Sequence, residues 1–179
     1  NIIDPMWDDN PIDVSTEVNF IWSIANKLRG PYQSDKYKDV IVPMTILRRF
    51  ECALAPTKEK VVAQFEKNPA YPEKAMQKIS GYQFYNTSKY DLTELCNDPD
   101  HLAENLKAYI DGFSANVRRI FNDLDFEAEI AKMERAHRLY IIVKAFSELD
   151  LDPRTIDGMK MGYIFEEIIR KFSENAEAG

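Results

Sequence analysis

The sequence is poor in the residue types that build metal sites and disulfide frameworks. It holds two cysteines and two histidines. Cys52 and Cys96 form no paired spacing, and His101 and His137 stand far apart among ordinary helical neighbours. Structural zinc sites, disulfide scaffolds and cysteine–histidine catalytic pairs all need such residues in clusters. We therefore expect no bound metal, no catalytic residue, and two reduced cysteines in a cytoplasmic protein.

Glycine-rich loops and long apolar runs are also missing. The six glycines are too scattered to form a loop that cradles a phosphate. No run approaches the roughly 18 to 20 apolar residues that a membrane span requires. Residues 1–14 are acidic and interrupted by Pro5 and Pro11, which predicts an extended leader and argues against a signal or transit peptide.

An excess of basic residues is lacking as well. The formal net charge is −7, which counts against a protein that binds nucleic acid by itself but is compatible with a local basic face. One candidate set for DNA contact is Lys27, Arg29, Lys36, Lys38, Arg48 and Arg49. These cations either contact a phosphate backbone or form a solvated face, with Lys27 and Arg29 stabilising the negative end of a helix dipole.

A second basic set follows later in the chain. It comprises Arg118, Arg119, Lys132, Arg135 and Arg138. Glu127, Glu129 and Glu134 stand among these cations, so the pattern favours surface ion pairs over a binding face.

Helical periodicity dominates the rest of the sequence. Apolar residues recur every three or four positions from residue 18 to residue 28, and again from residue 37 to residue 54. Gly30 and Pro31 separate these two helices, while Pro43 predicts a kink in the second helix or its start. Further stripes predict one helix over about 99–122 that continues through Gly112. The whole pattern predicts an all-α, multi-helix bundle over residues 15–175.

One short segment breaks this periodicity. Residues 82–90 alternate aromatic and polar side chains, which predicts a short β-like strand or an irregular ordered loop. Its aromatic residues are Tyr82, Phe84, Tyr85 and Tyr90. Because they lie outside any helical stripe, we interpret them as candidates for contact with a partner subunit.

Four blocks of sequence carry a family resemblance. They are FIWSIANKLRGPY followed by DKYKDVIVPMTILRRFE, SGYQFYNTSKYDL, DPDHLAENLKAYIDGFSANVRRIF, and MGYIFEEIIRKFSE. Together they resemble the N-terminal helical domain of the modification (M) subunit of type I restriction-modification systems. Those subunits are adenine-specific DNA methyltransferases.

The resemblance implies a division of labour. In the family, S-adenosylmethionine is bound by a later catalytic domain, so we expect no cofactor site in this chain and residues 176–179 to be a tail that leads to that domain. The implied partners are the specificity (S) subunit, a second M subunit, the restriction (R) subunit and double-stranded DNA, in a prokaryotic cytoplasm.

Two further readings stand beside the resemblance. Asn68-Pro69-Ala70-Tyr71 is similar to the Asn-Pro-Pro-aromatic motif of adenine methyltransferases, but it lacks the second proline and a preceding glycine-rich loop, which favours a helix-terminating turn. The acidic composition also allows a free-standing helical protein–protein interaction module without a nucleic-acid role.

Overall fold

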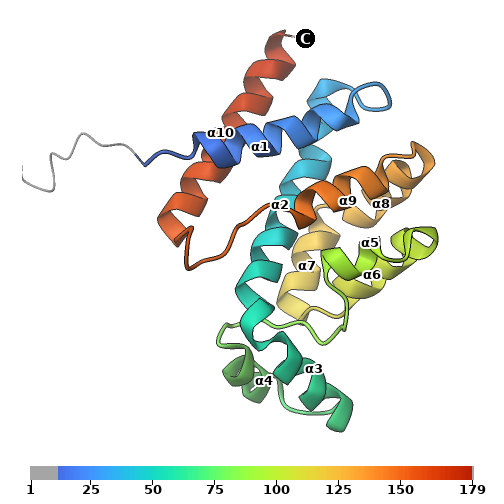
Figure 1. Cartoon of the computed structure of the whole chain (residues 1–179), viewed down its shortest axis with the longest axis vertical. Coiled ribbons are helices and arrows are strands. Elements are labelled where there is room, and N and C mark those ends of the chain that lie inside the picture. The colour runs from blue at the N-terminus through green and yellow to red at the C-terminus, as the bar shows by residue number, and fades with distance from the viewer. Residues whose placement is uncertain (1–11, 179) are drawn as a thin grey trace, which may run out of the picture.

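The computed structural model describes residues 12–178, and these residues form helices and connecting loops without a strand (Figure 1). The α-helices are α1 Ser15–Ala25, α2 Tyr37–Leu54, α3 Lys58–Lys67, α4 Glu73–Ser80, α5 Leu92–Cys96, α6 Leu102–Asp111, α7 Ala115–Asp123, α8 Phe126–Arg135, α9 Leu139–Ser147 and α10 Gly158–Ala178. Short 3-10 turns are η2 Asn26–Leu28, η3 Ser34–Lys36, η4 Ala55–Thr57 and η5 Pro99–His101. The predicted all-α fold class is confirmed.

Helix α2 lies at the centre of this arrangement. It contacts α1, α8, α9 and α10, and Figure 1 shows it passing between the upper and lower parts of the molecule. Val40, Ile41 and Leu47 are completely buried along it. The helix begins at Tyr37, six residues before Pro43, so the alternative that it starts at the proline is wrong. Packing on several sides compensates for the backbone hydrogen bond that proline removes.

Two helix ends show local signals in the sequence. Gly81 closes α4 with φ +81°, in the left-handed region that favours glycine. Asp91 caps α5, where its carboxylate accepts from the backbone N–H of Glu94 at 2.7 Å. Because caps and breakers act locally, these boundaries are visible in the sequence before any tertiary contact is known.

The predicted helix over residues 99–122 is wrong, because the chain breaks at Gly112 between α6 and α7. The loop of residues 85–88 crosses the break. Gly112 O accepts from Thr87 N at 2.8 Å, and Ser114 N donates to Tyr85 O at 2.9 Å. A Cβ at Gly112 would lie 2.7 Å from Ser88 Cβ. The backbone of this loop therefore takes the place of a continuous helix.

The segment of residues 82–90 has one isolated antiparallel bridge, between Asn86 and Phe113. Asn86 is 1% exposed. Its side-chain amide donates to Tyr109 O at 2.9 Å and its Oδ1 accepts from Ser88 N at 2.7 Å. The expectation of an irregular segment with a β-like contact is confirmed, and a buried asparagine holds it in place.

The predicted terminal segments lie only partly within the described residues. Residues 1–11 of the predicted leader lie outside the described residues. Helix α10 continues to Ala178, so residues 176–178 of the predicted tail are helical. Among the helices of residues 12–178, none combines the length and the apolar character needed to cross a membrane.

Candidate nucleic-acid interface

The loop that follows η2 brings the first basic set against another part of the chain. Gly30 has φ +103°, a conformation that glycine adopts without strain. This allows Tyr32 N to donate to Leu28 O at 3.0 Å, closing a tight turn. The turn directs Tyr32, which is 3% exposed, into the protein.

Tyr32 anchors the loop on α8. Its hydroxyl donates to Glu129 Oε2 at 3.2 Å, and the Lys132 ammonium lies 4.2 Å from the centre of its ring, a cation–π contact. Burial, followed by the negative charge of Glu129, raises the pKa of the Tyr32 hydroxyl, while the positive charge of Arg135 opposes that rise. Tyr32 therefore lies close to three charged side chains of α8.

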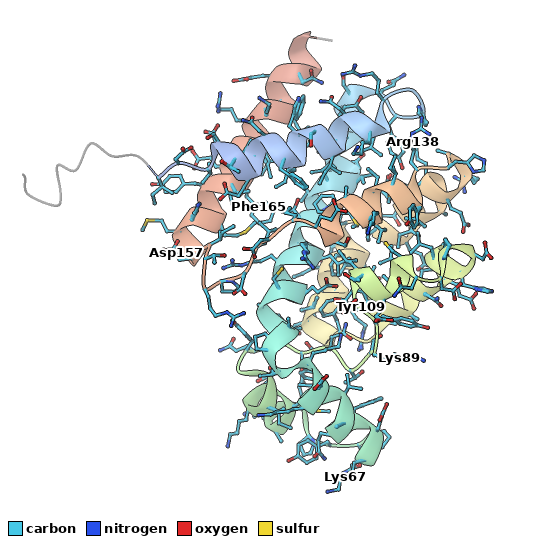
Figure 2. All side chains as sticks on the ribbon, viewed as in Figure 1. Lys67, Lys89, Tyr109, Arg138, Asp157 and Phe165 are labelled. Carbon is cyan, nitrogen blue, oxygen red and sulfur yellow. The ribbon has the colours of Figure 1, made fainter. Side chains whose placement is uncertain are left out.

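A second contact joins the same two segments. A Cβ built on Gly30 would lie 3.9 Å from Nη2 of Arg138, so the guanidinium packs against the bare backbone of the turn. Arg138 N donates to Met133 O at 2.9 Å, after a left-handed His137 with φ +57°. Figure 2 shows Arg138 beneath the loop that joins α1 to α2.

We name the result the composite basic surface. Its cations are Lys27, Arg29, Lys36, Lys38, Lys132, Arg135 and Arg138. Within the described residues, no carboxylate lies within 4.0 Å of any of these seven groups. The prediction that the second basic set forms ion pairs is therefore wrong, because Arg118 and Arg119 also have no carboxylate within 4.0 Å among the described residues. Glu129 binds Tyr32, Glu127 lies 3.9 Å from Lys107, and the guanidinium of Arg118 donates to the carbonyls of Asp111 and Phe113.

Arg48 and Arg49 do not join this surface. Both are half-buried. The guanidinium of Arg48 donates to Leu149 O at 2.6 Å and contacts Glu51 at 2.6 Å. That of Arg49 donates to the carbonyls of Leu151 and Ile156. These arginines hold the connector between α9 and α10 on α2, so the structure separates them from Lys27, Arg29, Lys36 and Lys38, for which DNA contact stays a prediction.

The aromatic segment is divided in a similar way. Phe84 packs on Phe50 with ring centres 4.5 Å apart, and the hydroxyl of Tyr90 donates to Asn105 Oδ1 at 3.3 Å. Tyr85 is partly buried, and Tyr82 is 38% exposed. Partner contact stays a prediction for these residues, and Tyr82 presents most of the available surface.

A buried polar cluster around Glu51 was not predicted from the sequence. This carboxylate accepts from Tyr109 Oη at 2.7 Å and from Leu92 N at 2.9 Å. Burial raises the pKa of Glu51, whereas the bond from Tyr109, the charge of Arg48 and the bond from Leu92 N act in the opposite direction. Lys58 lies 5.0 Å from the Tyr109 ring centre, and burial lowers its pKa. The signal for this cluster was a single glutamate on an apolar helix face.

A cleft of about 560 Å³ opens beside this cluster. Its wall includes Arg48, Lys58 and Asp91. The side-chain oxygens of Glu51 are already bonded, and the ammonium of Lys58 donates to Tyr90 O at 2.8 Å. The bonds of Glu51 connect α2 to Leu92 of α5 and to Tyr109 of α6. No group of three or more metal-binding side chains gathers within residues 12–178.

The segment that resembles a methyltransferase motif is a turn. Asn68 Oδ1 accepts from Ala70 N at 3.1 Å, and Tyr71 N donates to Asn68 O at 3.0 Å. All three residues lie between α3 and α4, and Asn68 and Ala70 are exposed. The asparagine side chain therefore supports the local backbone, as the turn interpretation predicted.

The described part of the chain is thus an all-helical domain whose buried polar groups connect helices and whose fold brings two basic segments of the chain together. A family model described as the HsdM N-terminal domain matches residues 18–146. The chain belongs to this family, the N-terminal region of the type I restriction-modification M subunit, and the resemblance seen in the sequence is confirmed. Searches of curated proteins and of solved structures gave no match.

Proposed function

We propose that this domain supports assembly of a type I methyltransferase complex and engages duplex DNA within it. Its partners in that complex are the S subunit, a second M subunit and the R subunit. The complete M subunit transfers a methyl group from S-adenosylmethionine to N6 of adenine in the prokaryotic cytoplasm. This domain contributes contacts to that reaction, and other parts of the subunit bind the methyl donor.

The observation that carries the proposal is the family match over residues 18–146. The structural role of the buried polar groups is compatible with a domain for binding and assembly. Glu51 and Lys58 are both bonded within the protein, where they connect helices.

Reconstitution of the M subunit tests the proposal. The complete subunit and a version lacking residues 1–179 are each mixed with the S subunit, and complex formation and methylation of a DNA duplex are measured. We expect the shortened subunit to lose assembly, methylation or both. Normal assembly together with normal methylation would remove the functional content of the proposal.

The methyl donor is tested separately by titration calorimetry with S-adenosylmethionine. We expect no specific heat of binding to the 179-residue chain. Saturable binding would contradict the proposed division of labour, because it would place a cofactor site in this domain.

A free-standing interaction module without a nucleic-acid role is the alternative. The net charge of −7 favours it, and Tyr82 offers an exposed aromatic side chain beside Phe84, with ring centres 5.3 Å apart. The same reconstitution separates the two functions. The alternative predicts that removal of the domain leaves assembly and methylation intact.

A further inference from the structure

We infer that the composite basic surface is where this domain contacts the phosphate backbone of duplex DNA. The inference rests on the proposed function and deepens it, because it assigns the contact to one face and to residues from two distant segments. Residues 26–38 supply Lys27, Arg29, Lys36 and Lys38, and residues 129–138 supply Lys132, Arg135 and Arg138.

The two segments carry more basic than acidic side chains. The two segments together hold seven basic side chains against three acidic ones. The acidic residues are Asp35, Glu129 and Glu134, and Asp39 directly follows the first segment. This face therefore carries a positive excess in a chain whose formal net charge is −7. A local excess of this kind attracts a polyanion and orients it toward one side of the protein.

The cations of this surface are also available to bind phosphate groups. Lys27, Arg29 and Arg135 are exposed, and no carboxylate of the described residues neutralises them at contact distance. Some surface cations elsewhere in the chain are paired: Arg170 contacts both Glu167 and Glu174. Paired cations contribute little to phosphate binding, because their charge is already balanced.

Two cations of this surface are already positioned by the fold before any DNA binds. Lys132 rests on the buried ring of Tyr32, and the guanidinium of Arg138 packs on the Gly30 backbone. Ordering a long side chain on binding costs conformational entropy. A cation that the fold already positions avoids part of this cost.

The composition of the surface favours a nucleic-acid backbone over an acidic protein. None of the exposed large apolar side chains of the described chain falls within residues 26–38 or 129–138. The exposed apolar residues nearest to these segments in the sequence are Tyr140 and Ile141, in the first turn of α9. Protein interfaces bury an apolar and aromatic centre, whereas phosphate contacts need only cations and polar groups. Such contacts carry no sequence information, so the surface positions DNA without selecting its target.

The test replaces three exposed cations and compares binding. Lys27→Gln, Arg29→Gln and Arg135→Gln are combined in the 179-residue chain, and anisotropy of a fluorescein-labelled DNA duplex is measured from about 50 mM to about 200 mM salt. We expect affinity at low salt to fall on the order of tenfold or more, and the slope of log affinity against log salt to become shallower by about two to three.

A matched control removes the same charge from the opposite end of the molecule. Lys60→Gln, Lys67→Gln and Lys74→Gln lie on α3 and α4, where all three side chains are exposed. Figure 2 shows Lys67 at the lower end, far from Arg138. This variant should retain DNA affinity within about threefold and keep its salt slope. Circular dichroism and thermal unfolding establish that both triple variants remain folded.

Each other outcome overturns the inference. Equal loss in both triple variants would mean that overall charge, and not this surface, governs binding. Failure of the unaltered chain to bind the duplex at about 50 mM salt would deny it a phosphate contact. Loss of binding to an S subunit, with DNA affinity unchanged, would identify the surface as a protein interface.

The inference fails separately from the proposed function. If the reconstituted M subunit needs this domain but the Lys27, Arg29 and Arg135 triple variant binds and methylates DNA normally, the domain acts through another surface. If the domain proves dispensable while the triple variant alone loses DNA affinity, the phosphate contact stands and the proposed role in the complex falls.

Discussion

At Gly112 the absence of a side chain is a packing requirement. The backbone angle there is ordinary, with φ −75°, so glycine is not needed for its conformation. A Cβ would meet Ser88 Cβ at 2.7 Å, Asn86 Oδ1 at 2.9 Å and Ser88 N at 3.0 Å. The last of these is backbone and cannot move without opening the loop. Glycine at this position thus allows residues 85–88 to pair with the α6–α7 break.

We predict that Gly112→Ala destabilises the protein by about 1–3 kcal/mol, the usual cost of overpacking. The measurement is the free energy of unfolding in urea. Gly162→Ala is the control, because nothing lies within 4 Å of a Cβ there and the residue sits inside α10. That substitution should leave stability unchanged or raise it by up to about 1 kcal/mol. A harmless Gly112→Ala would contradict the close approach.

The burial of Glu51 predicts how the stability of the protein depends on pH. Burial raises its folded-state pKa above the ordinary value of 4.5, so the folded protein holds this proton more tightly than the unfolded chain does. Its contribution to stability is therefore complete below about pH 4.5 and is lost as pH rises through the folded pKa. The Gln side chain of Glu51→Gln cannot ionise, so this variant does not lose that stability as pH rises.

We expect the free energy of unfolding of Glu51→Gln, relative to the unaltered protein, to increase from about pH 4.5 toward neutrality. Urea unfolding across this range measures it. Glu66→Gln is the control, because it removes a carboxylate from an exposed position on α3. A parallel pH dependence of Glu51→Gln and the unaltered protein would show that burial does not control the ionisation of Glu51.

At the scale of elements, the helices themselves were largely predictable. Their signals are local: apolar spacing along α2, a left-handed glycine after α4, a capping aspartate before α5. The break at Gly112 was not predictable, because its cause lies 24 or more residues earlier in the loop of residues 85–88. A tertiary contact there overrides a strong helical stripe.

The candidate interface was predictable only in part. The sequence identified Lys27, Arg29, Lys36 and Lys38 as a group, since they are neighbours along the chain. It assigned Arg48 and Arg49 to the same group, although their guanidinium groups serve the connector between α9 and α10. It also separated Lys132, Arg135 and Arg138 from the first set. Their union depends on the buried Tyr32, 97 residues before its partner Glu129, and no local pattern reports such a contact.

At the scale of the whole molecule, the helices do not share one core equally. The main cluster of buried apolar residues draws on α1, α2 and α5–α10. Val61 of α3 and Met76 of α4 are each 2% exposed but lie outside that cluster. The main contacts of α3 and α4 are with each other and with the adjoining η4 turn, and Figure 1 shows the two helices together at the lower end of the molecule. They form a small satellite unit.

We predict that this satellite opens before the rest of the fold. Native-state hydrogen exchange should show amides of residues 58–80 exchanging through local openings with little dependence on urea, while buried amides of α2 and α6 exchange only on global unfolding. Val61→Ala should lower protection in α3 and α4 alone, by about 2 kcal/mol. Val117→Ala is the matched case, since Val117 is also 2% exposed but belongs to the main cluster. Its effect should spread through the whole protein. Uniform protection, or an identical pattern from the two valine variants, would mean that α3 and α4 fold and unfold together with the body.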